Sequence, residues 1–85
     1  MPAKFFSISK KANKNASRLP LKIHHKVDLA FDAIKENPII GEKLHGELEG
    51  YYKYRIGNYR IIYTFDSRES VVTVVKIEHR QGVYR

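Results

Sequence analysis

Residues 51–65 read YYKYRIGNYRIIYTF, two alternating runs on either side of Gly57-Asn58. Aromatic and β-branched residues take every second position of each run, a period typical of strands with one buried face. A two-residue connection containing glycine is typical of a tight β-hairpin, because glycine tolerates the positive φ that such turns require. The segment therefore predicts two antiparallel strands, Tyr51–Ile56 and Tyr59–Phe65.

The turn also predicts which residues face each other across the hairpin. Counting back from it gives five pairs: Ile56 with Tyr59, Arg55 with Arg60, Tyr54 with Ile61, Lys53 with Ile62, and Tyr52 with Tyr63. Side chains alternate between the two faces of a strand, so the apolar set is expected on a core face. That set is Tyr52, Tyr54, Ile56, Tyr59, Ile61 and Tyr63. The outer face then carries Lys53, Arg55, Arg60 and Ile62.

The outer face would hold two arginines directly opposite each other, and like charges in such a pair repel. A site for a phosphate or carboxylate would account for Arg55 and Arg60, because guanidinium groups bind these anions with two hydrogen bonds. The alternative is that both are solvated or paired with a carboxylate; the candidates are Glu47, Glu49 and Glu78.

The N-terminal half predicts one strand and two helices. Lys4–Ser9 is rich in β-favouring residues, and Ser9 is a suitable N-cap for a short polar helix over Lys10–Arg18. Pro20 fits the first position of a second helix, which Asn37-Pro38 ends. Residues spaced three and four apart give this helix one apolar stripe: Ile23, Val27, Ala30, Phe31 and Ile34.

The C-terminal half continues with a loop and a last strand. Ile39–Gly50 contains three glycines and is expected to be a loop, anchored to the core by Leu44 and Leu48. Val71–Glu78 alternates as a strand with Val71, Thr73, Val75 and Ile77 expected inward. Lys76 and Arg80 then fall on the outer face with Lys53 and Arg60, and Tyr84 follows just beyond the strand.

This order predicts an α+β fold, strand–helix–helix–three strands, as a single domain over residues 1–85. The sheet is expected to be four-stranded and largely antiparallel, with the helical hairpin packed on one face. The face opposite would present a cluster of lysine, arginine and a tyrosine hydroxyl, suited to a phosphodiester.

Composition narrows the function. The chain has 85 residues, a net charge of +7 and no cysteine, which excludes a disulfide framework, a cysteine zinc site and a thiol nucleophile. It is too short for a doubly wound dinucleotide-binding enzyme. The charge favours a polyanion or an acidic protein as partner. No run is long enough to cross a membrane and no signal peptide is evident, so a cytoplasmic location is expected.

Three motifs resemble the RelE/ParE toxin superfamily. They are a K-L-x-G loop at Lys43–Gly46, an R-x-G-x-Y-R-x-x-Y hairpin at Arg55–Tyr63, and a terminal arginine and tyrosine at Arg80 and Tyr84. The spacing of the last two is similar to that of the RelE branch. The order of strands and helices also matches, so the resemblance covers essentially the whole chain.

The resemblance implies a toxin that pairs with a cognate antitoxin and cuts mRNA on the ribosome without a metal or cofactor. By position, Lys53 matches a catalytic lysine, acting as base or charge stabiliser, and Arg60 an arginine that stabilises the pentacovalent phosphate. Arg80 matches an arginine that stabilises charge or protonates the leaving group. Tyr84 matches a tyrosine that stacks on or orients the nucleotide. Arg55, with Lys76 and His45, is assigned to RNA or phosphate binding.

One position departs from the RelE pattern. RelE proper has a second lysine two residues before the one that matches Lys53, and Tyr51 stands there in this chain. The departure keeps two other functions open: a ParE-like inhibitor of DNA gyrase without RNase activity, and a non-catalytic basic module that binds RNA or an acidic partner. His79 is expected to lie on the core face. No spacing of histidines and carboxylates predicts a metal site.

Overall fold

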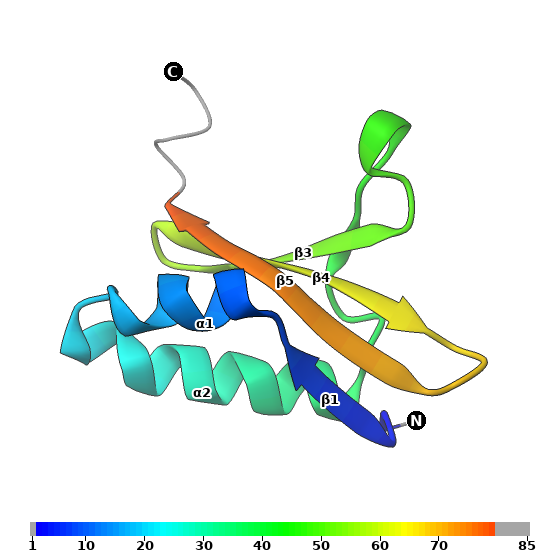
Figure 1. Ribbon diagram of the computed structural model, residues 1–85, viewed down its shortest axis with the longest axis horizontal. Helices are drawn as coiled ribbons and strands as arrows, with labels where there is room; N and C mark the ends of the chain where they lie inside the picture. The colour runs from blue at the N-terminus through cyan, green and yellow to red at the C-terminus, as the bar shows by residue number, and fades with distance from the viewer. Residues whose placement is uncertain (1, 80–85) are drawn as a thin grey trace.

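Five strands form one sheet in the computed structural model, which describes residues 2–79 (Figure 1). The elements are β1 (Phe5–Ile8), α1 (Lys10–Ser17), α2 (Leu21–Glu36), β2 (Glu42–Lys43), the 3₁₀ helix η1 (Gly46–Leu48), β3 (Tyr51–Ile56), β4 (Tyr59–Asp66) and β5 (Val71–His79). The strand order is β1-β5-β4-β3-β2, with β1 parallel to β5 and the other neighbours antiparallel. The predicted α+β class and element order are therefore confirmed.

The predicted strand number was one too low. Strand β2 lies inside the segment expected to be a loop, where Glu42 and Lys43 pair with Lys53 and Tyr52 of β3. Two residues cannot display an alternating pattern, so a strand this short leaves no periodic signal in the sequence.

The two helices play different parts. Apolar residues of α2 lie in the core beneath the sheet, and the predicted stripe is confirmed: Val27, Ala30 and Ile34 are buried, with Ile23 and Phe31 packed against them. Helix α1 instead runs along β5 beyond the end of β1. Its cap Ser9 accepts a hydrogen bond from the Ala12 N–H at 3.0 Å, and the side-chain oxygen of Asn15 accepts one from the Ile77 N–H at 3.0 Å. The backbone N–H of Ile77 in β5 thus finds its hydrogen-bond acceptor on this helix.

The register between β3 and β4 is the one that the turn predicted, with Arg55 opposite Arg60 and Lys53 opposite Ile62. The expected core face is confirmed, because its six apolar residues lie in or against the buried cluster. In β5, however, the inward set was predicted wrongly before Ile77. Val72 and Val74 are fully buried, whereas Val75 is not.

A bulge in β5 explains this error. Ile62 pairs with Lys76 but the next residue, Tyr63, pairs with Val74, which leaves Val75 as an extra residue. An extra residue reverses the alternation of a strand at that point. Lys76 and Glu78 consequently lie on the outer face, as predicted, while the residues before the bulge exchange faces.

Tyr63 fixes the start of the β2 segment to the core. Its side chain is fully buried. Its hydroxyl donates a hydrogen bond to the carbonyl of Pro38 at 2.9 Å and accepts one from the N–H of Gly41 at 2.9 Å. Burial raises the pKa of this hydroxyl to about 12, so it stays protonated and keeps its donor. A Cβ at residue 41 would lie 2.7 Å from the hydroxyl and 2.8 Å from the carbonyl oxygen of Lys53, which explains the glycine there.

Helices in the described part of the chain are all too short or too polar to cross a lipid bilayer.

Candidate functional site

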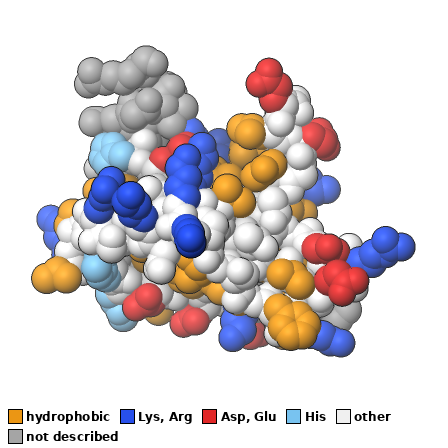
Figure 2. All heavy atoms as spheres, in the orientation of Figure 1, with side chains coloured by type: hydrophobic (Ala, Val, Ile, Leu, Met, Phe, Trp, Pro, Cys, Tyr) orange, Lys and Arg blue, Asp and Glu red, His pale blue; other side chains and the backbone are white. Residues whose placement is uncertain are grey.

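The outer face of the sheet carries a groove next to the segment that contains η1. Its cavity volume is about 270 Å³. We call it the outer groove and define it by the described residues that line it: Lys11, Leu44, Leu48, Tyr51, Arg60, Ile62, Val75, Lys76 and Glu78. Figure 2 shows hydrophobic side chains beside the η1 segment, with Lys and Arg side chains next to them. The groove therefore combines an apolar floor with a mainly basic wall.

Glu78 holds the two cations of the sheet that line this groove. Its Oε2 accepts a hydrogen bond from Nε of Arg60 at 2.7 Å, and its Oε1 lies 3.2 Å from Nζ of Lys76. Arg60 and Glu78 are direct partners in the β4–β5 register. Of the two interpretations left open for Arg60, pairing with a carboxylate is thus observed, and the carboxylate is Glu78.

The electrostatics of Glu78 favour its charged form. Burial disfavours the carboxylate, but hydrogen bonds from Arg60 and Lys76 outweigh burial and hold the pKa of Glu78 below its usual value of 4.5. The trio consequently carries a net charge of +1 at neutral pH. Lys11 adds a further charge from the first turn of α1, so the groove keeps an excess of positive charge for an anion.

Lys53 and Arg55 lie on the same face but outside the groove lining. Lys53 is opposite Ile62, the floor residue that pairs on its other side with Lys76. The side chain of Lys53 is only 15% exposed, and its Nζ lies 3.8 Å from Oε1 of Glu42. Arg55 is exposed to solvent at the end of β3. These two cations therefore flank the groove on the β3 side.

His45 is not brought to the groove. It precedes η1, its side chain is 80% exposed, and its Nδ1 lies 4.0 Å from Glu49. His79 lies on the core face as expected, with its ring 4.8 Å from that of Tyr59 in an edge arrangement. The predicted catalytic residues Arg80 and Tyr84 lie outside the described residues.

Among the residues that line the groove, Leu44, Leu48, Lys11 and Val75 were not predicted from the sequence to lie there. Leu44 and Leu48 were expected to anchor a loop to the core, but they line the outer groove, and Leu48 is 47% exposed. Lys11 belongs to α1, and its place in the groove lining could be predicted only by knowing that this helix runs along β5. The alternating pattern did place Glu78 on the outer face. Its choice over the other candidate carboxylates as the partner of Arg60 required knowledge of the strand order.

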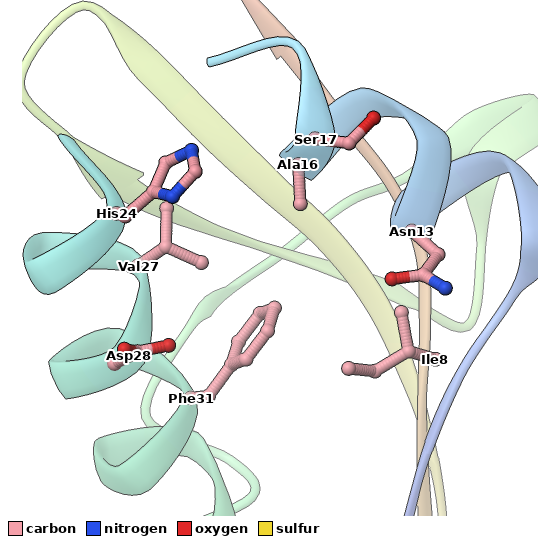
Figure 3. A pocket seen from close by; sticks show the side chains of 8 residues that line it. All are labelled: Ile8, Asn13, Ala16, Ser17, His24, Val27, Asp28 and Phe31. Atoms are coloured by element: carbon pink, nitrogen blue, oxygen red, sulfur yellow. The ribbon is translucent and has the colours of Figure 1, made fainter. Parts of the chain in front are cut away.

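A second cavity of about 370 Å³ lies between α1, α2 and β1 (Figure 3). Ile8, Val27 and Phe31 form much of its wall. Nε2 of His24, also in the wall, lies 3.0 Å from the carbonyl oxygen of Leu19. No lysine or arginine occurs among the described residues lining this cavity, so it does not suit an anion. Within residues 2–79, His, Asp and Glu side chains form no group of three able to hold a metal ion.

The outer groove is chemically suited to an extended anionic ligand. Arg60 and Lys76 can bind a phosphate or carboxylate, and the floor of Tyr51, Ile62 and Val75 can accommodate an adjoining apolar or aromatic group. A nucleotide and an acidic amphipathic peptide both have this combination of groups.

Comparisons with known proteins assign the family. The family model described as the ParE toxin of type II toxin–antitoxin systems matches residues 6–84. The chain is 32% identical over 76 residues to Toxin RelG of Mycobacterium tuberculosis, covering 87% of each protein. It is 33% identical over 81 residues to Toxin RelE of the same organism, covering 93% of this chain and 84% of the relative.

Solved structures agree with this assignment. The toxin–antitoxin complex RelBE2 of Mycobacterium tuberculosis contains a chain 28% identical to this one, with a TM-score of 0.83 and coverage of 94% of this chain and 100% of that chain. The isolated RelE toxin of E. coli is 25% identical, with a TM-score of 0.78 and coverage of 94% and 89%. The chain therefore belongs to the RelE/ParE superfamily of toxins from type II toxin–antitoxin systems.

Proposed function

We propose that this toxin is an endoribonuclease that cuts mRNA on the ribosome. In the reaction, a ribose 2′-oxygen attacks the adjacent phosphorus, and the bond from phosphorus to the 5′-oxygen of the next nucleotide breaks. The products are a 2′,3′-cyclic phosphate and a 5′-hydroxyl. RelE-named relatives support this proposal, and so does a groove that joins an apolar floor to a basic wall.

The position of Arg60 is the observation that carries the proposal. Its side chain is only 16% exposed, and its contact with Glu78 uses Nε. The terminal nitrogens Nη1 and Nη2 take no part in that hydrogen bond. A guanidinium fixed in this way can donate to two oxygens of a phosphate, and its charge stabilises the extra negative charge of the pentacovalent state.

The other residues receive roles by their position around Arg60. Lys53 stabilises charge or serves as base, and Lys76, Arg55 and His45 contact RNA phosphates away from the cleaved bond. We extend the same proposal to Arg80 as charge stabiliser or proton donor. Tyr84 would stack on or orient a nucleotide. Both follow β5 in the sequence.

We also propose that a cognate antitoxin covers the basic face or the helices with an acidic or amphipathic segment. The solved relatives include toxin–antitoxin complexes, and the net charge of +7 favours such a segment. Binding of the antitoxin should weaken as the salt concentration rises, because exposed charges are screened. A complex whose affinity does not change with salt would contradict this part of the proposal.

A specific pair of observations favours a second candidate, inhibition of DNA gyrase without RNA cleavage. The matching family model is that of the ParE toxin, and Tyr51 stands in the groove lining where RelE proper has a lysine. The non-catalytic basic module is the remaining alternative. Each of the three candidates makes a different biochemical prediction.

A reconstituted translation system separates these candidates. The purified toxin should cut a translated mRNA, leave 5′-hydroxyl ends, and leave the same mRNA intact when ribosomes are omitted. Arg60→Ala is the matched inactive control. Gyrase supercoiling measured in parallel should be unaffected. Loss of supercoiling with intact mRNA would instead establish the ParE-like function, and neither effect would support the non-catalytic module.

A further inference from the structure

Arg60 lies between opposite charges on its two neighbouring strands. Arg55 of β3 is its direct partner on one side, and Glu78 of β5 is its direct partner on the other. Arg55 repels the guanidinium and Glu78 attracts it, so both forces direct the side chain towards β5. The β5 side is where Lys76, Val75 and Lys11 line the outer groove.

Glu78 uses both carboxylate oxygens in this arrangement. Oε2 binds Nε of Arg60 at 2.7 Å and Oε1 lies 3.2 Å from Nζ of Lys76. The side chains of Arg60 and Glu78 are 16% and 27% exposed, which restricts their freedom to leave this geometry. One carboxylate thus fixes the relative position of two cations that are otherwise long and flexible.

We propose that Glu78 is a positioning residue, which holds Arg60 by Nε so that its terminal nitrogens face the groove and meet the reacting phosphate. The proposal rests on the RNA-cleaving function proposed above and adds a role for a residue whose negative charge has the same sign as that of the substrate. Fixing a charge-stabilising group before the reaction avoids the cost of orienting it during the reaction.

The geometry distinguishes positioning from masking. A carboxylate that blocks an arginine against phosphate is expected to occupy the terminal nitrogens, which are the preferred donors for a phosphate fork. Glu78 binds Nε instead. The nearby ammonium group of Lys76 also lowers the negative potential that Glu78 would present to an incoming phosphate.

The first test is a measurement that needs no activity. The Nε–H of Arg60 is observed by ¹⁵N NMR in the wild-type toxin, in Glu78→Gln and in Glu47→Gln. Glu47→Gln is the matched control because it removes the same charge from the exposed η1 segment beside the groove. We expect exchange of the Arg60 Nε–H with water to be slow in wild type and Glu47→Gln, and at least about tenfold faster in Glu78→Gln.

The second test is kinetic, in the reconstituted translation system. Glu78→Gln should lower kcat by about tenfold, because Arg60 is no longer held in place. It should not raise KM, because the substitution removes a negative charge that repels the RNA. Glu47→Gln should leave kcat unchanged. In an Arg60→Ala background, Glu78→Gln should cause no further loss, because there is no guanidinium left to position.

Several results would overturn the proposal. In the wild-type protein alone, an Arg60 Nε–H that exchanges as fast as that of exposed Arg55 would refute it, whether or not the variants fold. A kcat that stays constant or rises in Glu78→Gln would show that Glu78 masks Arg60 or has no effect. If the wild type cuts no RNA but Arg60 exchange depends on Glu78, the proposed function fails while the positioning of Arg60 by Glu78 stands.

Discussion

Arg55 and Arg60 face each other directly across the β3–β4 hairpin, but within residues 2–79 only Arg60 is held by a carboxylate. Arg55 is exposed at the end of its strand, whereas the Arg60 side chain is 16% exposed and hydrogen-bonded to Glu78 at 2.7 Å. The side chains of these two paired arginines thus differ in their freedom to move. We expect this difference to separate a catalytic group from a general phosphate contact.

Substitution of Arg60 by alanine should abolish growth arrest and leave only slow residual mRNA cleavage. Loss of one preorganised charge-stabilising contact typically lowers the rate by about a hundredfold or more. Arg55→Ala is the matched control at the opposed position, and it should weaken RNA binding and reduce its salt dependence with little change in kcat. Cleavage kinetics and circular dichroism of both variants provide the check. A folded Arg60→Ala protein that still arrests growth would refute the catalytic assignment.

The Tyr63 hydroxyl should contribute to stability and not to catalysis. Tyr63→Phe leaves the Pro38 carbonyl and the Gly41 N–H without their buried partner. We expect the free energy of unfolding to fall by about 1–3 kcal/mol, as measured by urea denaturation. The cleavage rate per folded molecule should stay within about twofold of wild type, since the hydroxyl lies on the side of the sheet away from the groove. Unchanged stability would contradict the role of Tyr63 as the anchor of the β2 segment.

Acid should weaken the protein partly through Glu78. Because the pKa of Glu78 is lower in the folded state than its usual 4.5, its contribution is complete above that value and is lost as the pH falls through the folded-state pKa. Glu78→Gln should therefore lower stability by about 1–2 kcal/mol at neutral pH, a figure reduced for the partial exposure of the trio. The difference from wild type should shrink in acid. Urea denaturation of both proteins at neutral pH and at a pH below the folded-state pKa of Glu78 measures this difference in stability. A difference that grows in acid would contradict this account.

Tyr84 should affect cleavage more than folding. A base stacked on an aromatic ring gains about 1–3 kcal/mol, so Tyr84→Ala should reduce cleavage much more than it lowers the melting temperature. Tyr84→Phe should be milder if stacking dominates and nearly as damaging if the hydroxyl orients a proton. Cleavage rates and thermal melts of both variants decide this. A Tyr84→Ala protein that cuts normally but melts much earlier would make the residue structural.

The hairpin could be predicted in detail because its sequence carries local information. Gly57 adopts a φ of +61°, and the two-residue turn fixes the register that places Arg55 opposite Arg60. The bulge at Val75 has no such signal, since valine suits a regular strand and a bulged one equally well. The inward residues of β5 were therefore predicted wrongly as far as the bulge at Val75, whereas Lys76, Ile77 and Glu78 beyond it were placed correctly.

The outer groove was only partly predictable for a different reason. The faces of single strands follow from alternation, so Lys53, Arg60 and Lys76 could be assigned to one face. The choice of Glu78 over Glu47 and Glu49 as partner of Arg60 depends on the order of strands in the sheet. The contributions of Lys11 and Leu44 depend on how α1 and the η1 segment pack, and these long-range contacts leave no periodic pattern in the sequence.

The most direct test of the proposed function is a map of mRNA 5′-hydroxyl ends after brief induction of the toxin in cells without its antitoxin. Wild-type toxin should create new ends within translated coding regions, and induction of Arg60→Ala to the same level should create none. New ends that appear equally with both proteins, or growth arrest by the wild type without new mRNA ends, would contradict the assignment of this protein as an mRNA-cleaving toxin.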